Sequence, residues 1–165
     1  MRRVAVITAA FCLVALAGGL TENALAAEMQ ADAKIHVING PMPAVKAPDK
    51  NFTGDVSVAR LFPPQDPLHL SGGYVTFSPG SRTNWHSHPE GQMLIVTSGK
   101  GRVQQWGDPV IEIREGDVVW FPATVKHWHG AMPDQGMTHI SIAEIVEGKS
   151  SDWMEKVTDD QYSGK

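Results

Sequence analysis

The chain has 165 residues, 42% of them hydrophobic, and a formal net charge of -4 at neutral pH. A chain of this length and composition can bury the core of one compact domain. Its mild acidity and its singly scattered lysine and arginine residues argue against a nucleic-acid partner, which needs a basic surface, and against a polybasic membrane anchor.

Residues 1–26 have the pattern of a secretory signal peptide. A short basic start precedes an apolar run over residues 4–16, and a small-x-small cleavage motif ends at Ala26. The apolar run is shorter than the ~20 residues of a membrane span. We therefore expect a periplasmic or secreted protein, cleaved near Ala26, with no stable membrane anchor. Cys12 is the single cysteine and leaves with the signal, so disulfides and thiolate metal ligands are not expected.

Residues 27–50 are predicted to form an N-terminal arm ahead of a folded domain over residues 51–165. Prolines interrupt the arm repeatedly, so any regular structure in it should be short. We expect the arm to lie against the domain or against a second subunit. His36 alternates with Ile35 and Val37 on a predicted short strand, so it should face solvent and not bind metal.

From Asp55 onward the pattern becomes that of β-strands. Short apolar and alternating runs are separated by glycine-containing turns, among them one at residues 98–101. Strands are predicted at 56–60, 73–77, 85–88, 93–98, 101–106, 110–114, 117–122, 125–129 and 138–146. Many short strands at this spacing indicate an all-β domain, either a sandwich or a small barrel.

The C-terminal tail changes character. Residues 152–157 have an acid-led composition that tolerates helix, and Thr158 with Gln161 resembles a helix capping box. One or two helical turns are expected here, packed outside the strands. Trp153 is the predicted buried anchor of this tail.

Two histidine pairs dominate the domain. His86 and His88 are two residues apart on a predicted strand, and His127 and His129 repeat that spacing. Side chains at i and i+2 share one face of a strand, so each pair points to one place, and Gln92 follows the first pair after a turn. A single His-x-His is usually a surface accident, but two pairs that each follow a glycine turn favour a metal centre.

Two longer motifs carry a resemblance to a known family. Gly80-x5-His86-x-His88-x3-Gln92-x6-Gly99 resembles the first cupin motif, with Gln92 where most cupins have glutamate. Gly116-x5-Pro122-x-Thr124-x2-His127 resembles the second, with Thr124 in place of a usual glycine. The chain is most similar to small bacterial cupins that include manganese-dependent hydroxynitrile lyases. The resemblance implies a single jelly-roll β-barrel with a short C-terminal helical segment.

The resemblance also implies roles for the site residues. His86, His88, Gln92 and His127 would hold the metal, in agreement with the strand geometry. His129 faces the same interior and would sit further out. His139 matches the candidate proton-transfer residue of the family, and a core histidine bonded to a backbone carbonyl is the alternative interpretation. His139 and His129 are therefore the two candidate catalytic bases.

The expected cofactor is a divalent transition metal. Three imidazoles and one amide are neutral, so the ion keeps its full charge and is a stronger Lewis acid than beside a glutamate. Manganese is the first choice from the resemblance, and iron, nickel, cobalt or zinc also suit such ligands. The expected reaction is cleavage or formation of a cyanohydrin or a related small hydroxy or carbonyl compound. A metal-dependent dioxygenase and a non-catalytic small-ligand binder are the alternatives.

Four residues near the histidines are candidates for the wall of a small-molecule pocket. They are Val75, Phe77, Thr83 and Met93. An ordinary core position is the competing interpretation for each. Trp85 and Trp128 alternate with the histidines, so they should lie on the opposite face, in an outer layer or an interface. Together with the arm, they suggest a homodimer or a higher homo-oligomer.

Overall fold

A computed structural model describes residue 35, residues 37–62 and residues 69–165. The predicted signal peptide, the first part of the predicted arm and His36 lie outside the described residues. The chain divides into two compact units, Met1–Val37 and Ile38–Lys165, and the second contains all of the elements described below. No helix in the described part of the chain is long and apolar enough to cross a membrane.

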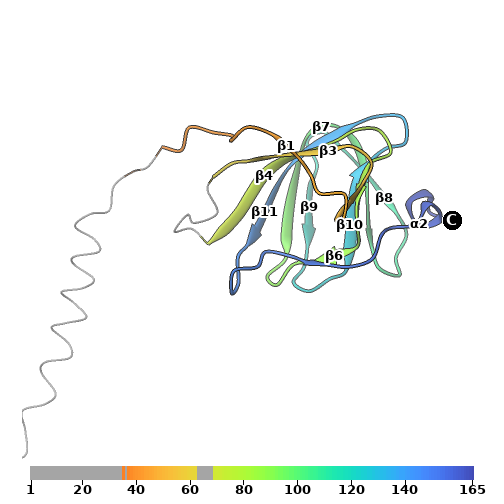
Figure 1. Ribbon diagram of the computed structural model, residues 1–165. Coiled ribbons are helices and arrows are strands. Elements are labelled where there is room, and N and C mark those ends of the chain that lie inside the picture. The colour runs from red at the N-terminus through yellow and green to blue at the C-terminus, as the bar shows by residue number, and fades with distance from the viewer. Residues whose placement is uncertain (1–34, 36, 63–68) are drawn as a thin grey trace, which may run out of the picture. The chain divides into compact units, whose positions relative to one another are not determined.

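The second unit is a curled antiparallel β structure (Figure 1), which confirms the predicted all-β class. One sheet contains, in spatial order, β1 (Val45–Lys46), β3 (Val56–Arg60), β4 (Leu70–Phe77), β11 (Met137–Glu144), β7 (Gln92–Gln105) and β9 (Val118–Phe121). The other contains β2 (Phe52–Thr53), β5 (Arg82–Thr83), β10 (His127–Ala131), the second half of β7, and β8 (Ile111–Arg114). β6 (His86–Ser87) pairs with β10, and β12 (Asp152–Trp153) pairs with β6.

Strand β7 belongs to both sheets, which corrects the prediction of a turn at residues 98–101. Its first half pairs with β11 and β9, and its second half pairs with β10 and β8. Gly99 stands at the crossing point with φ +78°, and the register against β11 shifts beside it. The glycine therefore does not end a strand but lets one strand bend from the first sheet into the second and close the barrel.

Replacing Gly99 with alanine should destabilise the fold far more than the same change at Gly107. Both residues have positive φ, so both variants pay the conformational cost, roughly 1 kcal/mol. A Cβ atom at Gly99 would also lie 2.0 Å from the backbone oxygen of Gly136, whereas one at Gly107 meets no atom within 4 Å. We expect Gly99→Ala to lose about 3 kcal/mol or more in urea unfolding. Equal losses for the two variants would contradict this account.

Inward-facing side chains of the two sheets form the main core. Alternation along each strand directs every second residue inside, and the buried apolar members are Ala47, Val56, Val75, Phe77, Leu94, Val96, Val103, Ile113, Phe121, Ala131 and Met137. The histidines of the two motifs share this interior face. The polar site is therefore built into the apolar core.

A second, smaller core lies under the C-terminal segment. Trp85 and Trp128 do face away from the histidines, but they are only 1% and 0% exposed and pack with Val157 and Tyr162. This corrects their predicted place in an outer layer or an interface, because the protein covers them with its own tail. Trp153, the predicted anchor, is 38% exposed, and Val157 and Tyr162 are the buried anchors instead.

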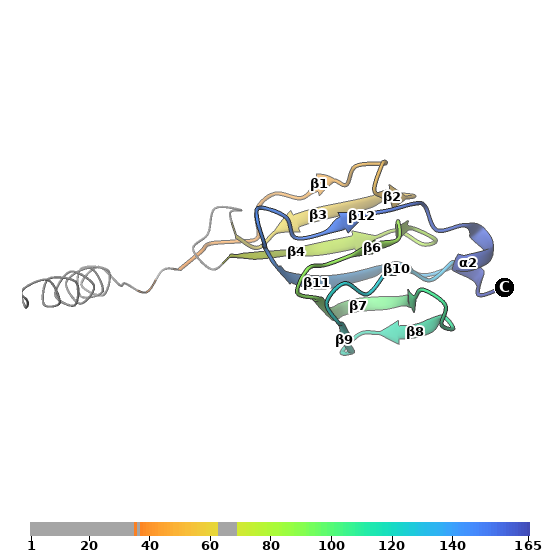
Figure 2. The same ribbon diagram turned by 90° about the horizontal axis from the view of Figure 1, so that it is seen from below.

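The tail follows the barrel to one end of the domain and finishes in helix α2 (Asp159–Ser163), as Figure 2 shows. Thr158 and Gln161 form the predicted capping box, with each side chain hydrogen-bonded to the backbone N–H of the other. The Tyr162 hydroxyl donates a hydrogen bond to the carbonyl of Ala131 on β10 (2.7 Å). The tail is thereby fixed to the strand that carries His127 and His129.

Candidate metal centre

The four histidines of the two motifs meet inside the barrel because β6 pairs with β10. His127 is the register partner of His86, and alternation then turns His88 and His129 to the same interior side. None of the four is more than 6% exposed. Gln92, the first residue of β7, is 4% exposed and completes the group from a third strand.

The ring nitrogens of this group lie close together. Single nitrogen atoms of His86, His127 and His129 are all within 4.8 Å of one another. The Gln92 Oε1 atom lies 3.1 Å from His127 Nε2. A buried three-histidine group of this kind is able to bind a metal ion.

Three of the histidines are oriented by backbone carbonyl groups. In each, the Nδ1 atom donates to a carbonyl oxygen: His86 to Asn84 (3.0 Å), His88 to Ser150, and His127 to Val125 (2.8 Å). A carbonyl can only accept, so Nδ1 carries the proton and Nε2 presents a bare lone pair. This is the arrangement that orients imidazole rings as metal ligands.

The polar atoms at the centre fit a cation. Gln92 donates from its NH2 group to Ser141 Oγ (2.9 Å), so its oxygen faces the bare Nε2 of His127. Two facing lone pairs repel unless a positive charge lies between them. The Nε2 atom of His88, whose proton is on Nδ1, is also buried and has no hydrogen-bond partner among the described residues. Such an orphaned acceptor is costly in a core unless an ion satisfies it.

His129 and His139 form a separate pair. His139 Nε2 lies 3.2 Å from His129 Nδ1, and the His139 ring packs on Phe77 with centroids 5.6 Å apart. The side-chain partner of His139 is therefore a second imidazole. His139 is fully buried behind His129, which faces the cavity.

Burial holds all five histidines in the neutral form. Desolvation is the largest cause in each case, and it lowers the pKa of His127 and of His139 from 6.5 to about 4. The pKa values of His86 and His129 lie well below 6.5, since neighbouring imidazoles add to the burial, and the pKa of His88 is also lowered. Neutral imidazole is the form that binds metal or accepts a proton.

The metal-free protein should lose stability as the pH falls from 6.5 to 4. Between pH 6.5 and pH 4 the histidines of the unfolded chain become protonated, whereas the buried histidines of the folded protein stay neutral. The free energy of unfolding therefore decreases with falling pH. A pKa lowered from 6.5 to about 4, as at His139, corresponds to roughly 3 kcal/mol. Urea unfolding in chelator at pH 7, 6 and 5 measures the slope, which His139→Gln should reduce. A free energy that stays flat over this range would contradict the neutral core.

A cavity of about 160 Å³ opens beside the histidines. Val75 and Thr83 are among the residues that line it. Phe77 lies behind the wall, where it packs against His129 and His139. Met93 does not line the cavity: it is 37% exposed on the outer face of the sheet, because strand neighbours alternate and Gln92 faces inward.

Six further lining residues were not predicted from the sequence, namely Phe52, Ser71, Ser141, Ser150, Ser151 and Trp153. Trp153 stacks on the ring of His86, with centroids 4.7 Å apart and an interplanar angle of 27°. Ser141 is two residues beyond His139 on the same strand, so period-two alternation was a signal that could have identified it. Ser150 and Trp153 belong to the tail, whose path over the barrel has no signature in local sequence.

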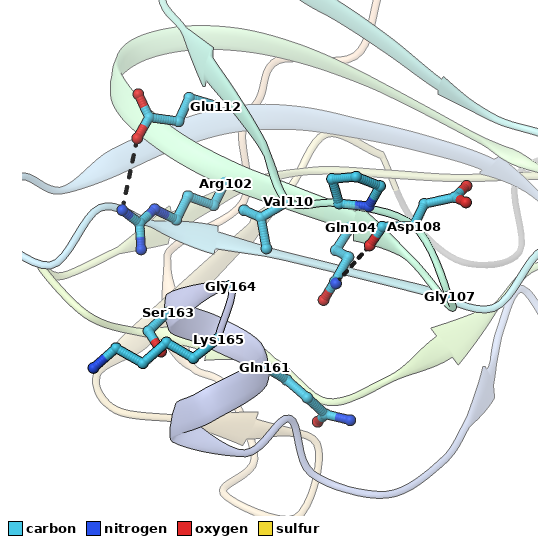
Figure 3. Close-up of a pocket in the computed structure, with 11 residues that line it drawn as sticks. Arg102, Gln104, Gly107, Asp108, Val110, Glu112, Gln161, Ser163, Gly164 and Lys165 are labelled. Atoms are coloured by element: carbon cyan, nitrogen blue, oxygen red, sulfur yellow. Dashed lines mark hydrogen bonds and ion pairs between the residues drawn. The ribbon is translucent and has the colours of Figure 1, made fainter.

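A larger hollow of about 630 Å³ lies elsewhere, between β8 and helix α2 (Figure 3). Arg102, Glu112 and Gln161 are among its lining residues, and Arg102 forms an ion pair with Glu112 (3.6 Å). It shares no residue with the cavity at the histidines. Size therefore does not identify the site in this protein, whereas the buried convergent polar groups do.

Comparisons with known proteins agree with this geometry. Residues 73–142 match the cupin domain family. The chain is 53% identical over 123 residues to an (R)-mandelonitrile lyase of Granulicella tundricola, a match that spans 74% of this chain and 94% of that protein. A cupin-like protein from Thermotoga maritima superposes with a TM-score of 0.69 at 40% identity, over 78% of this chain and 96% of the other. A cupin barrel protein from Rhodopseudomonas palustris shares the fold, with a TM-score of 0.55 and 19% identity over 78% and 89% of the two chains.

Proposed function

The chain belongs to the cupin family, and on that premise we propose that it is a metal-dependent lyase that cleaves cyanohydrins such as mandelonitrile to an aldehyde and hydrogen cyanide. The 53% identity to a mandelonitrile lyase, over nearly the whole of that relative, is the observation that carries the proposal. The buried histidine group beside a small cavity supplies the chemical basis for it. The same site would also run the reverse reaction, cyanohydrin synthesis.

The proposed metal ligands are His86, His88, Gln92 and His127. The three histidines whose ring nitrogens lie within 4.8 Å of one another include His129 in place of His88. We prefer His88 because its Nδ1 is anchored on a backbone carbonyl, as in His86 and His127, and its Nε2 has no hydrogen-bond partner among the described residues. In His129, by contrast, the Nδ1 atom contacts the Nε2 atom of His139. Manganese is the proposed ion, with iron, nickel, cobalt and zinc as alternatives for this donor set.

The bound ion supplies Lewis-acid polarisation of the substrate hydroxyl, at full divalent charge because every ligand is neutral. When His129 donates its Nδ1–H to His139 Nε2, the His129 Nε2 lone pair faces the cavity and accepts the hydroxyl proton. The bond between the carbinol carbon and the nitrile carbon then breaks, and its electron pair leaves with cyanide. His129 returns the proton to cyanide, so aldehyde and hydrogen cyanide are the only products.

A single assay tests the proposal. Benzaldehyde release from mandelonitrile is followed for protein loaded with Mn2+, for protein treated with chelator, and for chelated protein resupplied with Mn2+. We expect turnover that is lost with chelator and restored by the ion. Oxygen uptake with no benzaldehyde release would support the dioxygenase alternative. Metal binding without either reaction would support the non-catalytic ligand-binding alternative.

We also propose that the protein acts outside the cytoplasm after cleavage near Ala26, as a homo-oligomer. The outer face of the first sheet carries a ladder of uncharged side chains, in which Trp120 pairs with Met93 and Val118 with Ile95 across β9 and β7. Met93, Val118 and Trp120 are 37%, 62% and 56% exposed. A chain with a net charge of -4 meets its own copy with least repulsion through an uncharged face.

Trp120→Glu is expected to shift the protein to monomer, because it places a charge in the centre of that ladder. Ile111→Glu is the matched control, since Ile111 is 60% exposed on β8 in the other sheet. Light scattering after size-exclusion chromatography measures the mass of each variant. A monomeric wild-type protein, or a Trp120→Glu variant of unchanged mass, would exclude this face as the interface.

A further inference from the structure

Ser141 lies beside the proposed metal centre without belonging to it. It is on β11, two residues after His139, so its side chain points to the barrel interior and lines the cavity. Its Oγ atom accepts a hydrogen bond from Gln92 Nε2 at 2.9 Å. Ser141 therefore contacts the end of the Gln92 amide that points away from the histidines.

The two ends of that amide differ chemically. Only the oxygen has lone pairs to offer a cation, whereas the NH2 group would exclude one and would instead donate to the bare Nε2 of His127. Both orientations fill nearly the same space, so packing hardly distinguishes them. When an ion holds the oxygen inward, the NH2 group at the far end of the amide needs an acceptor, and the Ser141 hydroxyl supplies one.

We propose that Ser141 is a positioning residue that keeps Gln92 with its oxygen toward the metal centre and thereby sets the affinity for the ion. The inference rests on the proposed ligand set. Without the hydroxyl, the oxygen-inward orientation that the ion requires leaves the NH2 group of Gln92 buried and unpaired. Binding of the ion then has to overcome this penalty.

The test compares Ser141→Thr with Ser141→Val in a titration of Mn2+ against a competing chelator. Threonine keeps the hydroxyl, and valine has nearly the same shape without it. We expect Ser141→Thr to bind Mn2+ within about threefold of wild type and Ser141→Val to bind roughly 10- to 100-fold more weakly, the range for residues that orient metal ligands. Equal affinities for the two variants would overturn the proposal.

The same two substitutions in a Gln92→Ala background separate positioning from a general structural effect. If Ser141 acts through Gln92, the threonine and valine variants should bind Mn2+ equally once the amide is gone. A remaining difference of tenfold would mean that the hydroxyl acts by another route, and the proposal would fail. Wild-type protein that takes up no ion would instead overturn the metal centre itself, whereas normal uptake with equal Ser141 variants would overturn this inference alone.

Discussion

Replacing His127 with alanine is expected to abolish both metal binding and mandelonitrile cleavage. His127 is fully buried, its ring stacks on Phe121 with centroids 3.8 Å apart, and its Nε2 faces Gln92 at the centre of the site. Loss of a metal that contributes several kcal/mol to the transition state lowers the rate by on the order of 10³ or more. Elemental analysis and benzaldehyde release measure the two effects in the same sample.

His69→Asn is the matched control for that variant. His69 is exposed, does not line the cavity, and has φ +53°, a conformation that asparagine tolerates well. It should keep both metal and activity. If His127→Ala retained a full complement of metal, the ion would have to be bound elsewhere and the ligand assignment would be wrong.

Replacing His129 with glutamine should stop turnover while leaving the metal in place. His129 faces the cavity and is the proposed base, so its loss removes the acceptor of the hydroxyl proton. Loss of a positioned base typically costs 10²- to 10⁴-fold in rate. We expect a fall of that order in kcat, with the metal content unchanged by elemental analysis.

His139 offers the comparison that assigns the base. Its proposed role is to accept the Nδ1–H of His129, so His139→Leu should lower kcat by a smaller factor, and His139→Gln, which can still accept, should recover part of the loss. If the His129 variant retained full turnover while His139→Gln was inactive, the catalytic base would have to be assigned to His139. Loss of metal from the His129 variant would instead make His129 a ligand.

The sequence alone was sufficient where local periodicity carries the information. Alternation predicted that His86 shares one face with His88, and His127 with His129, and the glycine turns predicted most of the strands that hold them. The capping box at Thr158 was equally local and is present in the structure. Each of these features depends on residues within a few positions of each other, because strand alternation and helix capping are set by the local backbone geometry.

Tertiary structure decided the features that depend on pairing between distant segments. Residues 98–101 look like a turn in isolation, yet β11, β8, β9 and β10 all pair with the strand that runs through them. Trp153 looks like an apolar anchor, but pairing of β12 with β6 stacks it on His86 at the cavity. Ser141 acquires a role only because β7 brings Gln92 beside it. The sequence determined which side chains face inward, and the fold determined which of them meet, because contacts between segments far apart in the chain arise only when the sheets close.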